Sequence, residues 1–281
     1  MVANIEYDHA DIYPDLEAIL LAFRRFVTLI PRRGLLLLGA DDRHAPSLRP
    51  DARCRVETFG LGDGADWQAH DLKAHPAGMT FAVRHSGSPF GLFEVALLGA
   101  YNVRNALAAI AVGHATGLSA TALAEALKSF KGVRRRLQLR GIARDVAVYD
   151  DFAHHPTAIA ETLSGVRSAF PDRRIWAIFE PRSATSCRKV FQHEFASAFD
   201  AADETVIAAV FRANLPDAER LSGEELVADM RRAGRKARHI HSVDDIVTTV
   251  TREARSGDLV IVMSNGGFDN IHQRLLASLA V

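Results

Sequence analysis

Two loops of the sequence combine residue types that could bind a charged ligand or move a proton. The first is DDFAHHP at 150–156 and the second is PRS at 181–183, and each follows an apolar run that predicts a strand. Ligands of open parallel sheets bind beyond the carboxyl ends of the strands. A helix cap would explain Asp151 alone, but it does not explain two adjacent histidines. The candidate binding residues of these loops are Asp151, His154, His155, Arg182 and Ser183.

The first loop could also be a metal site, because it combines Asp150-Asp151 with His154-His155. Zinc sites usually draw on Cys or His ligands at helical or hairpin spacing, and no third cluster of such residues is evident. The two cysteines of the chain are far apart and form neither a metal pair nor a disulfide framework. A binding loop without a metal is therefore the favoured interpretation.

A second group of metal-ligating residue types lies near the start of the sequence, in NIEYDHAD. Asp8, His9 and Asp11 combine carboxylates with one imidazole, and this set suits Mg²⁺ beside a phosphate better than zinc. The alternative is a solvated acidic loop that binds nothing. The segment has no predicted strand or helix before it.

Two further patterns could bind a nucleotide. Guanidinium groups of Arg134-Arg135-Arg136 offer forked donors that match phosphate oxygens, although a triplet alone is more typical of a solvated linker. Asn102 and Asn105 share one face at the start of a predicted helix, where they could read an adenine edge or simply cap the helix. The glycines of GLGDG do not match G-x-G-x-x-G and no helix follows them, so we reject a dinucleotide-binding fingerprint.

The second half of the sequence alternates strands with helices. Strands are predicted at 146–150, 174–180, 204–209, around 236–240 and at 258–263. Helices are predicted at about 156–169, 188–200, 222–233, 242–254 and 271–280. Capping boxes at Ser222 and Ser242 mark two of the helix starts. This alternation predicts an α/β fold with parallel strands and right-handed crossovers, in a doubly wound sheet.

The first half has a different organisation. An amphipathic helix is predicted over 15–30, and the leucines of 35–38 suit a strand that is covered on both faces. Within residues 53–99, short strands are predicted in CRVETF, MTFAVRH and LFEVALL, and two helices follow at 102–116 and 119–130. The composition changes at 131–141, which predicts a hinge between domains.

Length and charge exclude several classes of protein. The 281 residues, 48% of them hydrophobic, fit one large or two modest folded domains. Lys and Arg total 34, as do Asp and Glu, so the net charge of zero argues against nucleic-acid or membrane partners. Apolar stretches fall far short of the roughly 20 residues of a membrane span. The first residues do not resemble a signal peptide. We therefore expect a cytoplasmic protein.

Four motifs follow one another in the sequence: NIEYDHAD, YNVRNALAA, FKGVRRRLQLRG and VYDDFAHHPTAI. In this order they resemble the motifs of the Mur ligase family, which builds bacterial peptidoglycan precursors. The resemblance covers nearly the whole chain. The last block is typical of the branch that joins an amine to the muramic acid carboxylate. Within that branch, DDFAHHPTAI, FEPRSAT and SNGGFDNIH resemble the tripeptide-joining members more than the alanine-adding members.

The resemblance implies part of an ATP- and Mg²⁺-dependent amide ligase. Residues 1–133 would belong to the central ATPase-type α/β domain, and residues 134–281 would form the Rossmann-like carboxyl-terminal domain. The substrates would be UDP-N-acetylmuramate and the murein tripeptide L-alanyl-γ-D-glutamyl-meso-diaminopimelate, recycled from the cell wall. The alternatives are part of a UDP-N-acetylmuramate–L-alanine ligase and a non-catalytic peptide-binding module.

The resemblance also implies roles for single residues. His9 would hold Mg²⁺ and would act in catalysis together with Arg136, which would meet the transferring phosphate. Adenine would be read by Asn102 and Asn105, and ribose would be bound by Asp151. The peptide or the reaction intermediate would be contacted by His154, His155, Arg182 and Ser183.

The chain departs from the family pattern in several places. It has no G-x-x-G-K-[ST] loop to cradle ATP phosphates, and it lacks the upstream glutamate ligand and the domain that holds the UDP-sugar. Tyr101 stands where the family usually has histidine in the adenine-binding helix. We therefore expect the carboxyl-terminal part of a ligase that is inactive by itself, either a deliberately shortened protein or a gene with a misassigned start.

Overall fold

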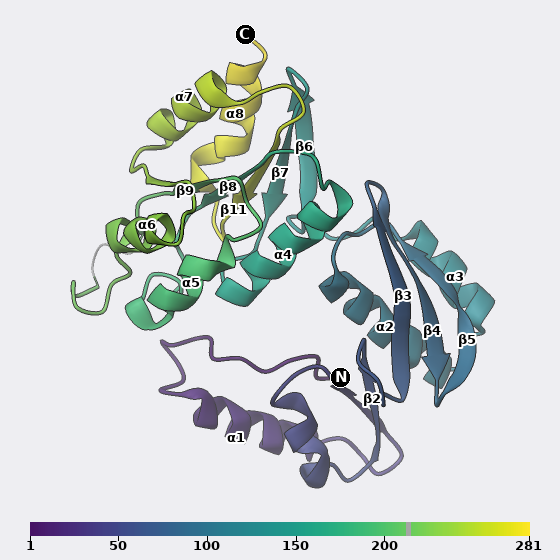
Figure 1. The fold of residues 1–281 in the computed structure, drawn as a ribbon. Helices are drawn as coiled ribbons and strands as arrows, with labels where there is room; N and C mark the ends of the chain where they lie inside the picture. The colour runs from purple at the N-terminus through teal and green to yellow at the C-terminus, as the bar shows by residue number, and fades with distance from the viewer. Residues whose placement is uncertain (212–214) are drawn as a thin grey trace. The chain divides into compact units, whose positions relative to one another are not determined.

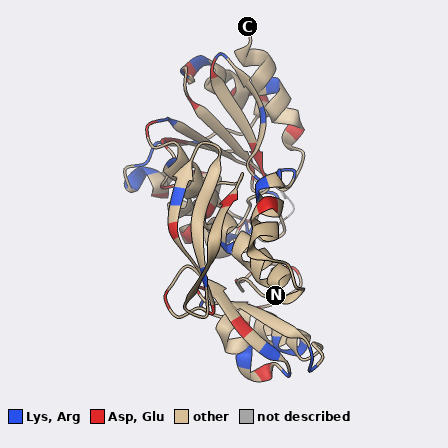
Figure 2. Ribbon diagram, turned by 90° about the vertical axis from the view of Figure 1, so that its right-hand side faces the viewer, with Lys and Arg blue, Asp and Glu red and all other residues tan. Residues whose placement is uncertain are grey.

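The computed structural model describes residues 1–211 and 215–281, which form two compact units (Figure 1). The first unit spans Met1–Lys131 and the second spans Gly132–Val281. Positive and negative residues are interspersed along the ribbons of both units, in line with the net charge of zero (Figure 2). No helix of the described residues is long and apolar enough to cross a membrane.

The first unit contains a five-stranded sheet in the order β1-β2-β3-β4-β5. The pairings β1–β2 and β2–β3 are parallel, whereas β3–β4 and β4–β5 are antiparallel. The strands are β1 Leu35–Gly39, β2 Arg55–Gly60, β3 Trp67–His75, β4 Gly78–His85 and β5 Ser88–Val95. The helices are α1 Leu16–Val27, the 3-10 helix η1 Ala45–Asp51, α2 Ala100–Ala115 and α3 Ala120–Ser129.

The predicted leucine strand forms β1 and is covered on both faces. Leu37 belongs to an apolar cluster with α2, α3 and the neighbouring strands. Leu36 and Leu38 belong to a second cluster with α1 and η1. The predicted amphipathic helix forms α1. It begins after Asp15, whose side chain accepts a hydrogen bond from the Ala18 amide.

Strand β3 is not among the strands predicted from the sequence, although it is the longest strand of this sheet. Trp67 and Ala69 are buried and alternate with polar residues. A bulge between His70 and Lys73 then shifts the register against β4. The bulge breaks the period of two that identifies a half-buried strand, so the segment resembles a polar loop in sequence.

The amino-terminal segment adds one parallel bridge beside β1. The Val2 amide donates to the Leu37 carbonyl oxygen at 2.8 Å, and the Gly39 amide donates to the Val2 carbonyl oxygen at 2.9 Å. Position 39 requires glycine, because a Cβ there would lie 1.9 Å from the Ala3 carbonyl oxygen. The sequence predicts only a loop here, since a bridge made by the main chain leaves little pattern in the side chains.

The second unit contains a six-stranded sheet in the order β10-β9-β8-β11-β7-β6. All pairings are parallel except β6–β7 at one edge. Helices α4, α5 and α6 pack on one face and α7 and α8 on the other, which confirms the predicted α/β fold with a doubly wound sheet (Figure 1). The strands are β6 Gln138–Ala143, β7 Val146–Asp151, β8 Ile175–Phe179, β9 Glu204–Ile207, β10 Ala237–His239 and β11 Leu259–Met263. The helices are α4 Pro156–Ala169, η2 Lys189–Phe191, α5 Gln192–Ala198, α6 Gly223–Arg232, α7 Val243–Glu253, η3 Phe268–Asn270 and α8 Ile271–Leu279.

The prediction of a hinge over all of 131–141 was wrong, because the second part of this segment enters β6. As an edge strand, β6 leaves Leu139 and Ile142 exposed, so its sequence lacks the alternation of a half-buried strand. The backbone bends in the preceding residues, where Arg135 and Leu137 have positive φ angles.

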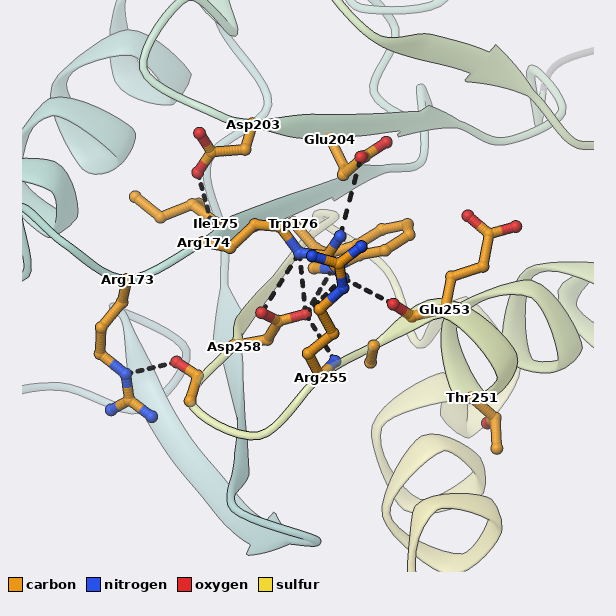
Figure 3. A network of polar contacts seen from close by, with 12 residues as sticks. Arg173, Arg174, Ile175, Trp176, Asp203, Glu204, Thr251, Glu253, Arg255 and Asp258 are labelled. Carbon is orange, nitrogen blue, oxygen red and sulfur yellow. Dashed lines mark hydrogen bonds and ion pairs between the residues drawn. The ribbon is translucent and has the colours of Figure 1, made fainter.

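A buried ionic network ties the amino ends of β8 and β11 together around Asp258 (Figure 3). Asp258 is 3% exposed and its Oδ2 accepts from Arg174 Nη2 at 2.7 Å and from Trp176 Nε1 at 3.0 Å. The backbone amide of Arg255 donates to the same oxygen at 3.0 Å. Arg174 Nη2 also donates to the Glu253 carbonyl oxygen at 2.6 Å. The network lies at the amino edge of the sheet, opposite the predicted binding loops.

Replacing Asp258 by Asn should lower the free energy of unfolding by about 2–4 kcal/mol, because Arg174 loses its buried carboxylate partner. Urea unfolding followed by circular dichroism measures this change. Asp217→Asn is the matched control, since Asp217 pairs with Arg220 at the surface and should contribute less than about 1 kcal/mol. Equal losses in the two variants would contradict the role of the network.

Lowering the pH should reduce the free energy of unfolding through protonation of Glu253, which lies at the same edge of the sheet. Hydrogen bonds from Arg238 and Arg252 lower the pKa of Glu253 from 4.5 to about 2. The stabilisation from this depressed pKa is complete above about pH 4.5 and is lost as the pH falls toward 2. Between about pH 6 and pH 3, Glu253→Gln should therefore lose less unfolding free energy than the wild type. Identical losses for the two proteins would show that Glu253 does not titrate in this way.

Candidate functional site

The carboxyl ends of three neighbouring strands bring predicted site residues together in the second unit. Strand β11 lies between β7 and β8, and all three run parallel. Their ends therefore lie at one edge of the sheet, where ligands of such folds bind. We refer to residues 150–155, 180–183 and 264–266 at this edge as the strand-end site.

The loop after β11 is held by two arginines. Arg135 Nη2 donates to the carbonyl oxygens of Ser264 and Gly266, at 2.5 and 2.7 Å. Gly266 also packs against Arg182, because a Cβ at position 266 would lie 2.1 Å from Arg182 Cδ. A larger residue here would displace the Arg182 side chain, so Gly266 of the GGF segment allows Arg182 its observed position.

Arg182 is oriented by a carboxylate and an aromatic ring. Its Nη1 lies 3.5 Å from Glu180 Oε1, and its Cζ lies 3.6 Å from the centroid of the Phe211 ring. Glu180 is buried and its Oε2 accepts from Ser264 Oγ at 2.6 Å, which joins the ends of β8 and β11. The Arg182 side chain remains 30% exposed, so part of its guanidinium fork can meet a ligand.

Ser183 forms a tight turn with Ser186. The Ser186 hydroxyl oxygen accepts from the amides of Arg182 and Ser183, at 3.1 and 2.9 Å. The Ser183 hydroxyl donates to Ser186 Oγ and accepts from the Ser186 amide. These bonds shape the backbone around Arg182, and a direct contact of Ser183 with a substrate stays a prediction.

Asp151 anchors the segment before β6 to the end of β7. It is 1% exposed, and its two oxygens accept from the amides of Ala153 at 2.8 Å and Leu137 at 2.6 Å. Burial raises the pKa of Asp151, against the two amide hydrogen bonds and the charge of Arg136. The predicted ribose contact would have to share a buried carboxylate that already binds two amides, so this geometry gives it no support.

The sequence identifies Arg135 only as one member of a possible phosphate-binding triplet, and Asp150 only as a possible metal ligand. Arg135 Nε donates to Asp150 Oδ1 at 3.4 Å, and His272 Nε2 lies 3.4 Å from the same oxygen. Burial alone would raise the pKa of Asp150, but the neighbouring His272 imidazole and Arg135 guanidinium leave it lowered. The arginine triplet in the sequence indicates that a cationic group lies near Asp150, but it does not show which of the three side chains points inward.

Arg136 is exposed and lies near the end of β7. Its Cζ is 5.5 Å from the centroid of the Phe152 ring, and Arg135 lies over the same ring at 5.1 Å. The two neighbouring arginines therefore differ in their contacts: Arg135 binds backbone carbonyl groups, whereas Arg136 faces solvent. An exposed guanidinium at this edge is available to an anion.

The two adjacent histidines make different contacts. His154 Nδ1 donates to the Phe152 carbonyl oxygen at 2.9 Å, so Nε2 is the ring nitrogen that this contact leaves for a ligand. His155 is the N-cap of α4, where its Nδ1 accepts from the Thr157 amide at 3.4 Å. The prediction that capping explains neither histidine was wrong for His155. Within the described ranges, no three metal-ligating atoms of this loop converge, so the metal interpretation has no support.

The predicted Mg²⁺ and adenine residues lie in the first unit. His9 has a 69% exposed side chain, with Nε2 4.0 Å from Asp8 Oδ2, and an accessible imidazole beside a carboxylate suits a hydrated divalent ion. Asn102 Nδ2 donates to the Leu98 carbonyl oxygen at 2.8 Å and secures the start of α2. Asn105 is exposed, with Nδ2 3.5 Å from Asn102 Oδ1. Asn105 is therefore the more accessible of the two for an adenine edge.

Fold and site together define an α/β protein that presents charged loops at one edge of a doubly wound sheet. Family models match both units: the Mur ligase middle domain matches residues 1–113, and the Mur ligase glutamate ligase domain matches residues 135–266. The chain therefore carries middle and carboxyl-terminal domains of the Mur ligase family, which confirms the resemblance at this level.

Several known proteins are similar to this chain over nearly its whole length. The UDP-N-acetylmuramate–L-alanine ligase of Desulfitobacterium hafniense is 35% identical over 277 residues, which cover 98% of this chain and 61% of that relative. The murein peptide ligase structure from Psychrobacter arcticus is 34% identical with a TM-score of 0.67, covering 95% of this chain and 56% of that one. The UDP-N-acetylmuramate–alanine ligase structure from Thermotoga maritima, 23% identical with a TM-score of 0.76, shares the fold over 96% and 56% of the two chains. This chain thus spans about three fifths of the length of the curated relatives it matches.

Asp151→Asn should destabilise the second unit, because an amide offers only one oxygen where two N–H donors converge. The unpaired donor should cost about 1–3 kcal/mol of unfolding free energy. Hydrogen exchange should accelerate at the Leu137 and Ala153 amides. Asp172→Asn is the control, since Asp172 is exposed in the same unit. Unchanged protection of both amides would contradict the anchoring role of Asp151.

Proposed function

We propose that this chain provides the nucleotide- and amine-binding parts of an ATP-dependent ligase that forms an amide bond on the carboxylate of UDP-N-acetylmuramate. The strand-end site, in a chain whose two units match Mur ligase domains in order, carries this proposal. In the proposed reaction, the muramoyl carboxylate accepts the γ-phosphoryl group of ATP. The amine then attacks the acyl phosphate, and phosphate leaves from the tetrahedral intermediate.

Arg182 is the residue that we assign to the amine substrate. Its guanidinium is oriented by Glu180 and Phe211 yet partly exposed, so it can bind a carboxylate through two parallel hydrogen bonds. His154 lies on the neighbouring loop, with Nδ1 bound to the Phe152 carbonyl oxygen, and its Nε2 is proposed to accept a hydrogen bond from the substrate ammonium. We propose that these two side chains contact opposite charges of one substrate.

The nucleotide contacts are proposed for the remaining predicted residues. Asn102 and Asn105 would face adenine, and Arg136 would meet the transferring phosphate. His9 would help to hold Mg²⁺, which neutralises charge on the phosphates when bound. Phosphoryl transfer depends mainly on such positioning and neutralisation, which suits a set of exposed arginine, histidine and amide groups.

The comparisons favour L-alanine as the amine substrate over the tripeptide that the strand-end motifs predict. The curated relatives at 35% identity are UDP-N-acetylmuramate–L-alanine ligases. The murein peptide ligase structure at 34% identity keeps the tripeptide as the second candidate. Both amines carry a carboxylate, so Arg182 alone does not select between them.

Chemical-shift mapping of the full chain with each amine at millimolar concentration tests the proposal. L-alanine should shift the backbone resonances of 150–155, 180–183 and 264–266, and Arg182→Ala should weaken its binding by about tenfold or more. Arg235→Ala is the control, because Arg235 pairs with Asp200 at the surface of the same unit. Shifts with the tripeptide but not with L-alanine would select the second candidate. No shifts in these loops with either amine would overturn the amine-binding assignment.

A further inference from the structure

Three metal-ligating side chains converge outside the strand-end site, at the edge of the second unit's sheet. Glu224 lies in the first turn of α6, His239 is the last residue of β10, and His241 follows it in the segment before α7. Each offers one ligand atom, and these atoms all lie within 4.8 Å of one another. The two imidazole centroids are 4.2 Å apart with ring planes inclined by 48°. Across residues 1–211 and 215–281, no other group of three such side chains is arranged in this way.

His239 has a buried ring nitrogen that no protein group satisfies. Its Nε2 is buried and has no hydrogen-bond partner among the described residues, and the ring lies beside Glu224 and His241. Buried polar atoms of folded proteins are nearly always paired, so an unpaired imidazole nitrogen in such a cluster points to a ligand.

A glycine at the start of α6 makes room for the His239 ring. A Cβ at position 223 would lie 2.5 Å from His239 Nε2, so Gly223 lets the imidazole reach the start of α6. Ser222 caps the helix through the Glu225 amide, and the Glu225 side chain pairs with Lys189 at 3.2 Å. Of the two adjacent glutamates, one is thus directed to a lysine and Glu224 is directed to the histidines.

We propose that Glu224, His239 and His241 bind a divalent cation of the Zn²⁺ class. Two imidazoles and one carboxylate suit Zn²⁺, Co²⁺ or Ni²⁺, whereas Mg²⁺ and Ca²⁺ prefer sites made of oxygen atoms. Three protein ligands leave one tetrahedral position for water. The ion would join the start of α6 to the edge strand β10, which pairs with β9 through only three residue pairs. This site is independent of the proposed ligase function.

Zinc titration of the metal-free full chain, in competition with a chromophoric chelator, tests the proposal. We expect one equivalent of Zn²⁺ per chain, and a binding constant weakened about tenfold or more by Glu224→Gln or His241→Gln. Both positions are exposed, so these substitutions should leave the fold intact. His193→Gln is the matched control, because His193 is an exposed histidine of α5 in the same unit.

Two further measurements distinguish a specific metal site from weak association of Zn²⁺ with the protein surface. Zn²⁺ should raise the Tm of the wild type and of His193→Gln, but not that of Glu224→Gln. Co²⁺ in place of Zn²⁺ should give the visible absorption bands of a low-coordinate site. Absence of stoichiometric binding by the wild type, or equal weakening in the control and the ligand variants, would overturn the proposal.

Discussion

The two adjacent carboxylates at the end of β7 are the constraint on which the strand-end site depends. Asp151 binds the backbone before and after it, so the chain that enters the second unit is fixed at the end of β7. Asp150 pairs with Arg135, whose guanidinium holds the carbonyl groups of the loop after β11. That loop seats Arg182 against Gly266. A continuous series of contacts therefore links the first residues of the second unit to Arg182, the residue proposed to bind the amine substrate.

The opposite edge of the sheet is fixed by a second ionic centre. Asp258 ties the start of β11 to the start of β8, which keeps these two strands in one register along their length. The loops after β8 and β11 project from strands that are also tied together at their amino ends, so the site can use exposed loops without losing its geometry. The ionic network at the amino edge holds the sheet together, whereas the carboxyl edge combines the structural contacts of Asp151 with the proposed binding residues.

Sequence reasoning located the strands that carry the site, because β7, β8 and β11 are apolar runs buried on both faces. It could not resolve which member of the arginine triplet turns inward, because positive φ at Arg135 and the contacts with Ser264 depend on chain segments far apart in sequence. Edge strand β6 and bulged strand β3 were missed because neither keeps a clean period of two. The motifs predict the tripeptide as the amine substrate, whereas the curated relatives at 35% identity are L-alanine ligases. A carboxylate-binding arginine suits both amines, so Arg182 alone does not distinguish them.

A double-mutant cycle on amine affinity tests most directly whether Arg135 places Arg182 through the loop of Gly266. Arg135→Lys keeps the charge but cannot bind two carbonyl groups as a fork, so it should weaken amine binding in the wild-type background. In the Arg182→Ala background the same substitution should have almost no further effect, giving a clear coupling energy. Strictly additive effects of the two substitutions would contradict this account of the site.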